Sequence, residues 1–277
     1  MDSWYDYPQY FDMVFEDETP IEVDFFEKVF DTVATGTVKR VLEPGCGSGR
    51  LVSAMAAKGY HSTGIDLSVP SIRYLKQRLR RRKLQDNAAC VVGDMTDISA
   101  SLETFAAGES SSDRAALTAP FDAVFCTFNT FRHLTSEKDA VAHLNSVADN
   151  LRPGGVYILG YHHLPMDAEE ASIERWRAKR GGTSICVTFR VLTLDRKTRI
   201  EHIRVSTLAK QRTGKVVRIR SEFPLRLYTY HQTRSLFKKV PRLELCGIYD
   251  FHYDLEEPRK LDNDLEDALF VFRKRPE

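Results

Sequence analysis

The stretch Val41-Leu42-Glu43-Pro44-Gly45-Cys46-Gly47-Ser48-Gly49-Arg50 decides the fold class of this chain of 277 residues. It begins as a short apolar strand and leads into a predicted helix at residues 51–58. Glycine has no Cβ, so it permits a tight turn between strand and helix and a close approach of the backbone to a ligand. Ligands of open α/β sheets bind at the carboxyl ends of the strands. The stretch therefore predicts a ligand site at this turn.

Glu43 stands two positions before the first of the three glycines. A dinucleotide fingerprint has the spacing G-x-G-x-x-G and holds a pyrophosphate at a helix N-terminus. A carboxylate at this place would repel a phosphate, whereas it suits a ligand that carries positive charge. Glu43 and the glycine spacing therefore argue against a nicotinamide-dependent oxidoreductase. The structural alternative is that Gly45, Gly47 and Gly49 serve only a tight turn.

Two further acidic residues follow the next two predicted strands. Asp66 ends the strand that begins at His61, and it lies 21 residues after Gly45 (66 − 45). An acidic residue about 20 positions after such a turn binds ribose hydroxyls in nucleotide-binding folds. Asp94 follows a strand at residues 89–92. Aspartate is also favoured as a helix N-cap, but the shared position of both residues at strand ends favours ligand binding.

The order of the predicted elements indicates an α/β fold. Strands at residues 121–126 and 156–159 continue the pattern, with a helix that ends at Leu151 between them. Strands at residues 243–249 and 268–273 complete the predicted sheet. Alternating strands and helices with short connections are typical of a parallel sheet that helices cover on both faces. We therefore expect a doubly wound, mostly parallel seven-stranded sheet.

These signatures, in this order over residues 41 to 160, resemble those of the class I S-adenosylmethionine-dependent methyltransferases, which have a Rossmann-like fold. The resemblance implies that S-adenosylmethionine is the cofactor and that its sulfonium and ammonium lie near Glu43. It also implies that Asp94 binds the adenine amino group. The cofactor-binding residues that it implies are Glu43, Gly45, Cys46, Gly47, Gly49, Asp66, Leu67, Asp94, Met95 and Phe128.

The second half of the chain departs from the minimal fold. Apolar and polar residues alternate over residues 184–194, 200–208 and 216–228, and polar turns separate the three runs. Alternation with period two predicts an antiparallel β-meander. We expect a helix at about residues 167–179 before it and another at about 231–239 after it. The chain is then one domain with an N-terminal cap segment (1–35), a cofactor-binding core (36–165), an inserted meander lid (184–229) and a return to the core sheet (230–277).

The aromatic N-terminal segment and residues 225–229 resemble a subgroup of methyltransferases that act on small molecules. The resemblance implies that the cap segment folds over the cofactor and that the meander walls an acceptor pocket. His133 follows the fourth strand and is the candidate general base, although a histidine packed at a helix start is an equally good interpretation. The other pocket candidates are Tyr10, Arg132, Arg226 and Tyr228.

The predicted reaction is direct transfer of a methyl group to a small-molecule acceptor. The alternatives are methylation of a protein or RNA, and a cofactor-binding protein without catalysis. Enzymes of this class that methylate amino groups of nucleic acids commonly carry an Asn/Asp-Pro-Pro-aromatic motif after the fourth strand, where this chain has Asn129-Thr130-Phe131-Arg132. The 40 basic and 39 acidic residues leave a net charge of +1, so no general field draws the protein to nucleic acid.

Composition fits a protein of the cytoplasm. The five cysteines are scattered, without disulfide or zinc spacing. The N-terminus lacks the cationic and apolar pattern of a signal peptide, and no apolar run approaches the roughly 20 residues of a membrane span. We expect neither a membrane partner nor a metal. Although His162 and His163 are adjacent, neighbouring side chains on a strand point to opposite faces.

Two polar segments have plain interpretations. The basic run from Arg78 to Lys83 could be a nucleic-acid patch, but it ends a predicted helix, where cations complement the helix dipole and face water. We expect a solvated helix end there. Residues 106–119 are rich in small and polar side chains, and they predict a surface loop.

Overall fold

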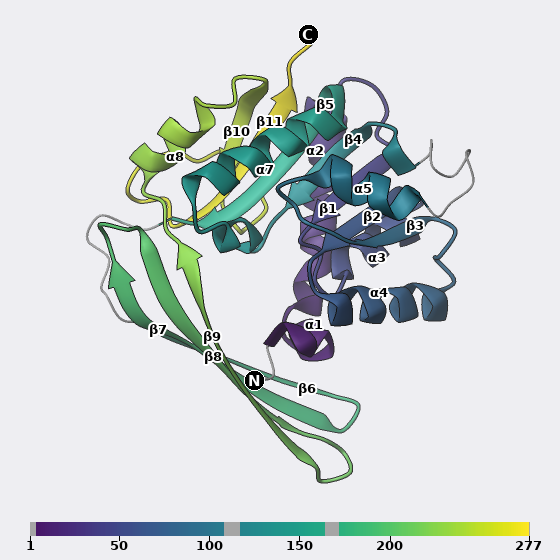
Figure 1. The fold of residues 1–277 in the computed structure, drawn as a ribbon, viewed down its shortest axis with the longest axis vertical. Coiled ribbons are helices and arrows are strands. Elements are labelled where there is room, and N and C mark those ends of the chain that lie inside the picture. Colours follow the sequence, from purple (N-terminus) through teal and green to yellow (C-terminus); the bar gives the residue numbers. More distant parts are fainter. Residues whose placement is uncertain (1–3, 108–116, 164–171, 277) are drawn as a thin grey trace.

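The computed structural model describes residues 4–107, 117–163 and 172–276, whose strands form two sheets (Figure 1). The larger sheet contains β1 (Arg40–Pro44), β2 (His61–Asp66), β3 (Ala88–Val92), β4 (Phe121–Cys126), β5 (Leu151–His162), β10 (Leu243–Tyr249) and β11 (Asp267–Lys274). Its order is β10-β11-β5-β4-β1-β2-β3. Strand β11 runs antiparallel to β10 and β5, and the other pairs of neighbouring strands are parallel. The predicted doubly wound, mostly parallel seven-stranded sheet is confirmed.

Helices cover both faces of this sheet. The described helices are α1 (Pro8–Phe15), α2 (Thr19–Val33), α3 (Arg50–Ala57), α4 (Val69–Arg82), α5 (Ile98–Ala106), α7 (Glu137–Asn150) and α8 (Tyr230–Phe237), with the 3-10 helices η1 (Trp4–Asp6), η2 (Glu16–Glu18) and η3 (Thr130–His133). Helices α5, α7 and α8 share one apolar cluster with the sheet, and α2 and α3 share another on the opposite face. Helix α4 packs against α3 in a smaller cluster.

Strand β5 shows why the central strands are apolar on both sides. Tyr157 and Leu159 belong to the cluster on the α7 face, and Val156 and Ile158 belong to the cluster on the α2 face. All four side chains are fully buried. Parallel sheets with helices on both faces bury both sides of each strand, so their strands read as nearly continuous apolar runs.

The smaller sheet is antiparallel and contains β6 (Ile173–Arg180), β7 (Thr183–Asp195), β8 (Ile200–Lys210) and β9 (Val216–Arg226) in that order. Figure 1 shows it below the larger sheet, close to the N-terminus and α1. One face buries alternate apolar residues of β7, β8 and β9 in a cluster that also contains Trp4 and Tyr10. The N-terminal segment therefore shares its core with the insertion.

The prediction of a helix at residues 167–179 is wrong for residues 172–179, which the structure describes. Residues 173–180 form strand β6, which pairs with β7, and residues 167–171 lie outside the described residues. Glu174, Arg175 and Arg177 are compatible with a helix, but Trp176 packs its ring against Phe15 and Phe189. Tertiary packing and pairing with a neighbouring strand override a weak local preference.

The basic run from Arg78 to Lys83 is only partly the solvated helix end that we expected. Arg80 and Arg81 are exposed, whereas Arg78 is buried. With 3.6 residues per helical turn, Arg78 lies on the same face of α4 as Leu75 and Leu79, which are buried in the core. The helical period therefore turns this arginine towards the protein.

No helix in the described part of the chain combines the length and apolar composition that a membrane span needs. The predicted loop at residues 106–119 lies mostly outside the described residues, and its first residue, Ala106, ends α5.

His143 is a fully buried histidine of α7 whose hydrogen bonds fix its tautomer. Its Nδ1 lies 2.9 Å from the carbonyl oxygen of Met95, and its Nε2 lies 2.7 Å from the hydroxyl of Tyr157. A carbonyl oxygen only accepts, so Nδ1 carries the proton and Nε2 accepts from Tyr157. Burial lowers the pKa of His143 to about 4. The folded protein therefore holds this ring neutral at neutral pH.

We expect His143→Gln to show how this ring affects stability at low pH. The unfolded chain binds a proton on His143 near its ordinary pKa of 6.5, whereas the folded protein binds it only near pH 4. The free-energy advantage of wild type over the variant should therefore shrink as pH falls from about 6.5 to about 4, by about 1.4 kcal/mol for each pKa unit of the shift. Urea unfolding of both proteins across this range measures it. A difference that stays constant with pH would contradict the assignment.

Candidate active site

The glycine turn, residues 45–49, lies at the carboxyl edge of the larger sheet. Gly45 N and Cys46 N donate to Ile65 O at 2.7 and 3.0 Å. Gly47 N donates to Asp66 Oδ2 at 2.7 Å. These three bonds attach the turn between β1 and α3 to the end of β2.

The three glycines differ in what surrounds them. A Cβ on Gly45 would lie 2.2 Å from a methyl carbon of Thr130, and one on Gly49 would lie 2.2 Å from a methyl carbon of Leu75. A Cβ on Gly47 would meet no heavy atom within 4 Å. All three have positive φ, at 71°, 50° and 70°. Packing alone explains two of the glycines, while the third faces open space that a ligand can fill.

Asp66 and Asp94 are not the N-caps of the helices that follow them. Ser68 caps α4 and Asp97 caps α5. Asp66 Oδ1 accepts from Ser68 N at 2.8 Å, and Asp94 Oδ1 accepts from the backbone and hydroxyl of Thr96 at 2.8 and 2.9 Å. Burial raises the pKa of Asp66, while Asp94 is exposed. The alternative that these two aspartates are helix N-caps is therefore excluded. Their binding of the ribose and the adenine amino group stays a prediction.

Apolar side chains next to these carboxylates face outwards. Leu67 is 69% exposed, and Val69 and Val92 are each about half exposed. They lie at the carboxyl ends of β2 and β3. Met95, in contrast, packs partly buried against the core, with its sulfur 3.8 Å from a Cβ placed on Gly45. An apolar surface beside two carboxylates suits a flat ring system with polar edges.

Glu43 is buried at the end of β1 and accepts from Val52 N at 3.2 Å. Burial raises its pKa well above the ordinary range, although Arg50 opposes the shift. Arg50 is itself buried and pairs with Glu22 of α2 at 2.6 Å. Sequence reasoning did not find this ion pair, because nothing in the local sequence connects α2 to the glycine turn.

Phe128 and Asn129 follow β4 with φ values of 65° and 69°. Such values are uncommon for residues other than glycine, and strained backbone of this kind concentrates at functional sites. The ring of Phe128 packs against Phe15 at 4.6 Å between centroids, and the Arg50 guanidinium lies 5.2 Å from its centroid. Phe128 therefore lies between the N-terminal helix α1 and the glycine turn.

Tyr5 and His133 lie 128 positions apart in the sequence and are in contact at this edge. The Tyr5 hydroxyl lies 2.7 Å from His133 Nε2, and the His133 ring packs against Phe223 of β9 at 5.3 Å. The Tyr5 carbonyl oxygen accepts from the hydroxyls of Ser68 and Ser71 at 3.3 and 3.2 Å. The N-terminal segment thus joins the start of α4, beside Asp66, to the loop after β4 and to the insertion.

His133 is a neutral ring at physiological pH. Desolvation by the surrounding protein, with a smaller effect of the Arg132 charge, lowers the pKa of His133 to about 4, although part of the ring is exposed to solvent. Burial, and then the Asp66 carboxylate, raise the pKa of Tyr5. A neutral tyrosine hydroxyl next to a neutral imidazole donates its proton to the free ring nitrogen.

The other pocket candidates lie elsewhere. Arg132 donates to Arg226 O at 3.0 Å and pairs with Glu201, while Arg226 donates to Thr135 O at 2.7 Å. These contacts join the insertion to the loop after β4. Tyr228 is fully buried against Phe131 and Tyr161, and Tyr10 is buried in the cluster of the insertion, stacked on Tyr7. An acceptor role for Tyr10, Arg132, Arg226 or Tyr228 stays a prediction.

The two histidines that end β5 have separate partners. His162 pairs with Asp267, and His163 lies 2.8 Å from the hydroxyl of Thr233. Across the described ranges, no group of three histidine, cysteine or acidic side chains is placed to hold a metal ion.

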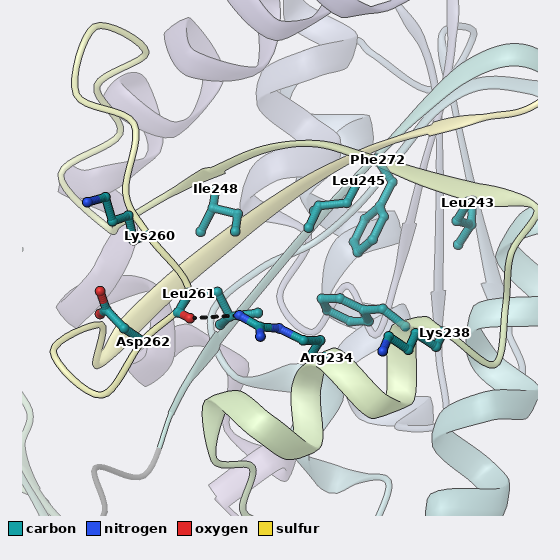
Figure 2. A pocket seen from close by; sticks show the side chains of 10 residues that line it. Arg234, Lys238, Leu243, Leu245, Ile248, Lys260, Leu261, Asp262 and Phe272 are labelled. Carbon is teal, nitrogen blue, oxygen red and sulfur yellow. Dashed lines mark hydrogen bonds between the residues drawn. The ribbon is translucent and has the colours of Figure 1, made fainter.

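Two cavities lie away from the glycine turn. One of about 630 Å³ lies between α8 and β10 at the far edge of the larger sheet, where Arg234, Lys238 and Lys260 surround an apolar floor (Figure 2). The other, of about 450 Å³, lies between α1, α4 and the β6–β7 hairpin. Residues 45–49 line neither of them.

Residues 41–155 match a family model described as a methyltransferase domain. These residues therefore match a methyltransferase domain. The matched residues include the glycine turn, Asp66, Asp94 and Phe128, and the family resemblance predicted from the sequence is confirmed.

The sequence is 30% identical to glycine N-methyltransferase of Rattus norvegicus over 129 residues, which cover 45% of this chain and 40% of that protein. It is 29% identical to cypemycin N-terminal methyltransferase of Streptomyces sp over 121 residues, which cover 44% of this chain and 41% of that protein. The chain thus spans well under half the length of each of these relatives. The similarity is confined to part of both proteins.

Solved methyltransferase structures share the fold over nearly the whole chain. A methyltransferase of Clostridium acetobutylicum superposes with a TM-score of 0.72 at 14% identity, covering 97% of both chains. The sugar N-methyltransferase KedS8 of Streptoalloteichus sp superposes with a TM-score of 0.64 at 17% identity, covering 93% of this chain and 87% of that one. The shared fold therefore extends beyond the domain that the family model matches.

The residues at the carboxyl edge fit S-adenosylmethionine. Gly47 leaves open space beside the turn, where the methionine part would lie, and Leu67 exposes an apolar face beside Asp66. We expect Gly47→Val to fill this space and to weaken cofactor binding by more than about tenfold, which is a loss of about 1.4 kcal/mol. Isothermal titration with S-adenosylmethionine measures the change.

Gly36→Val is the matched control for this substitution. Gly36 also has a positive φ, 80°, and no heavy atom lies within 4 Å of a Cβ placed on it, but it precedes β1 and lies outside the turn. Both variants place a β-branched residue at a positive φ, 50° at Gly47 and 80° at Gly36, so both should lower the melting temperature. Equal cofactor affinity in the two variants would contradict the placement of the cofactor at Gly47.

Proposed function

We propose that this protein transfers the methyl group of S-adenosylmethionine to an amine nitrogen of a small molecule. The observation that carries the proposal is the Tyr5–His133 pair at the carboxyl edge that also holds the glycine turn. Its polar atoms lie between the N-terminal segment and β9, where they would contact an acceptor. The activities named for the relatives, methylation of glycine, of a peptide N-terminus and of a sugar amine, support a nitrogen acceptor.

The cofactor would be held by residues from four strand ends. Glu43 and the glycine turn would surround the methionine part, and Asp66 would accept from the ribose hydroxyls. Asp94 would accept from the adenine amino group, with Cys46, Leu67 and Met95 beside the ring. Phe128 would lie near the sulfonium, since aromatic faces favour a cation within about 6 Å. When bound, the cofactor supplies an electrophilic methyl group whose transfer to nitrogen leaves a neutral thioether.

The hydrogen bond between Tyr5 and His133 Nε2, together with the low pKa of His133, favours an amine over a hydroxyl acceptor. A hydroxyl must lose its proton during attack, and a base with a pKa near 4 is weak for that task. A neutral amine attacks with its own lone pair. The Tyr5 hydroxyl, which donates to His133, would contact the amine N–H through its oxygen. Tyr5 and His133 would therefore orient the acceptor nitrogen towards the methyl group.

The N-terminal segment and the insertion, residues 184–229, would exclude water from the acceptor. Trp4 N donates to Ser221 of β9 at 2.6 Å, and Phe223 of the same strand contacts Tyr5 and His133. The insertion therefore reaches the acceptor edge. Correct placement of two reactants can contribute roughly 7–11 kcal/mol to catalysis in favourable systems.

We also infer that the protein works in the cytoplasm and acts on neither nucleic acid nor membrane. All five cysteines are free thiols, and three of them are buried. A reducing compartment keeps thiols in this state. The net charge of +1 gives no general attraction to a polyanion.

Incubation with labelled S-adenosylmethionine and a library of small amines, amino sugars, short peptides and alcohols tests the proposed function. We expect an amine to gain the mass of one methylene, and Gly47→Val to suppress this product relative to Gly36→Val. Fragmentation of the product identifies the methylated atom. A product methylated only on oxygen, or no product from any amine, would overturn the proposal.

We expect Tyr5→Phe and His133→Gln to lower kcat by about tenfold, the effect of one lost hydrogen bond, and to leave cofactor affinity unchanged. His133 stays neutral down to about pH 4. The pH profiles of wild type and His133→Gln should therefore share one acid limb, which the acceptor amine sets. His202→Gln, a change at an exposed histidine of β8, is the control. His133 would instead be a general base if His133→Gln lowered kcat by a factor of 10²–10⁴. In that case the pH profile of wild type would have an acid limb near pH 6.5, and the profile of the variant would lack it.

A further inference from the structure

We propose that Arg78 is a positioning residue that clasps helix α1 against the glycine turn. This inference rests on the proposed function, because the position of α1 affects cofactor binding only if the N-terminal segment covers the cofactor. Arg78 belongs to α4, and its side chain is buried between α1 and the turn. Arg78 lies outside the motifs on which the family resemblance rests, and its place in a basic run resembles a solvated helix end.

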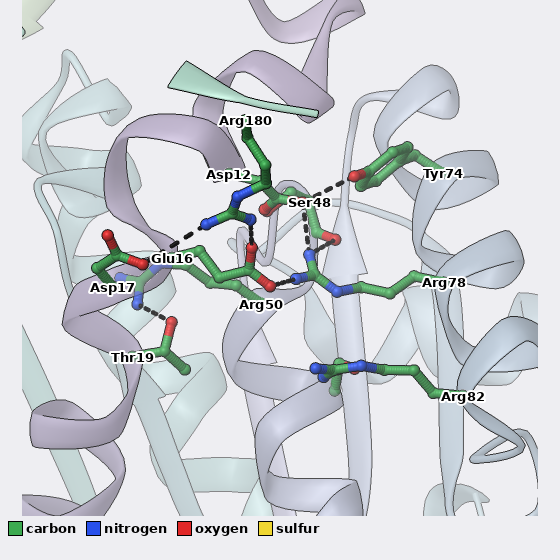
Figure 3. A network of polar contacts seen from close by, with 11 residues as sticks. Asp12, Glu16, Asp17, Thr19, Ser48, Arg50, Tyr74, Arg78, Arg82 and Arg180 are labelled. Atoms are coloured by element: carbon green, nitrogen blue, oxygen red, sulfur yellow. Dashed lines mark hydrogen bonds and ion pairs between the residues drawn. The ribbon is translucent and has the colours of Figure 1, made fainter. Parts of the chain in front are cut away.

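One guanidinium makes three contacts to two segments (Figure 3). Its Nη1 donates to Asp12 Oδ2 at 2.7 Å, and its Nη2 donates to Glu16 Oε1 at 2.7 Å. The same Nη1 lies 3.5 Å from the carbonyl oxygen of Ser48, which stands between Gly47 and Gly49. The end of α1 and the glycine turn therefore share one cation.

Neighbouring groups hold the two carboxylates in place. The Tyr74 hydroxyl donates to Asp12 Oδ2 at 2.8 Å, and Arg180 of β6 pairs with Glu16. Burial would raise the pKa of Glu16, but the hydrogen bond from Arg180 and the charge of Arg78 lower it overall. Glu16 is therefore ionised at neutral pH. The clasp thus connects α1, α4 and the β6–β7 hairpin.

The forked guanidinium is suited to this task. Its planar set of donors reaches two carboxylates and a carbonyl at once, whereas a lysine ammonium acts as a point charge. Arg78 is 7% exposed, so solvent screens its ion pairs little. Arg80, two positions later, is exposed, and the described contacts give it no ion pair.

The position of α1 affects the cofactor site directly. Phe11 and Phe15 of α1 pack against the ring of Phe128. The Arg50 guanidinium lies over the same ring. Release of α1 would therefore uncover Phe128 and the turn together. We infer that Arg78 sets how long the cap stays closed over the bound cofactor.

Hydrogen exchange of residues 8–15, measured by mass spectrometry, tests the clasp without any turnover. In Arg78→Met these amides should exchange faster than in wild type by about ten- to a hundredfold, the range for lost hydrogen bonds between charged groups. Exchange of the core strands should not change. Arg80→Met, a change on the same helix, should match wild type. Unchanged exchange of residues 8–15 in Arg78→Met would overturn the proposal.

Asp12→Asn separates the clasp from a general loss of folding. If the two residues act through each other, Arg78→Met/Asp12→Asn should open α1 no more than Arg78→Met does, because the shared contact is already lost. A double variant that opens as the sum of the two single effects would contradict the coupling. The double variant also removes the buried negative charge of Asp12, which Arg78→Met leaves without its cation.

Cofactor binding completes the test. Arg78→Met should raise the dissociation constant and the KM for S-adenosylmethionine by about ten- to a hundredfold, with a smaller change in kcat at saturating cofactor. A loss of kcat alone would overturn the positioning role. If wild type methylates nothing yet Arg78→Met opens α1 and weakens cofactor binding, the clasp stands and the proposed function fails. Hydrogen exchange and cofactor affinity thus test the role of Arg78, whereas product formation tests the proposed function.

Discussion

The attachment of the glycine turn to the end of β2 is the constraint on which the site depends. Ile65 O accepts from two consecutive backbone amides of the turn, and the Asp66 carboxylate accepts from a third. The other oxygen of Asp66 accepts from Ser68 N, at the start of α4. One carboxylate thus fixes the turn and the direction in which α4 leaves the sheet. The position of Arg78 on α4 follows from this arrangement.

The insertion is tied to the rest of the protein by two different kinds of contact. It shares an apolar cluster with the N-terminal segment. Its connection to the loop after β4 is polar, through Arg132, Glu201 and Arg226. A polar joint is directional and fixes orientation, whereas an apolar cluster tolerates small shifts. The N-terminal segment and the insertion therefore pack as one unit, and the contacts of Arg132 and Arg226 fix its orientation.

The sequence predicted the larger sheet and the position of the glycine turn because both have local signatures: apolar runs, glycine spacing and acidic strand ends. It failed where the deciding contact is remote. Strand β6 looked helical because only its pairing with β7 and the packing of Trp176 decide its conformation. The contact between Tyr5 and His133 spans 128 positions, so no local pattern contains it. The burial of Arg78 could have been found from the helical period, which places it beside Leu75 and Leu79.

The contact between Trp4 and Ser221 spans 217 positions. Ribosomes make the N-terminus first, so the cap has no complete partner until β9 has emerged. The core from β1 to β5 spans only residues 40–162, and its contacts are nearer in sequence. Contacts of long sequence separation close slowly, since loop closure costs entropy before it gains any contact. The order of synthesis therefore delays the packing of the N-terminal segment on the insertion until after the strands of the core, β1 to β5, have been made.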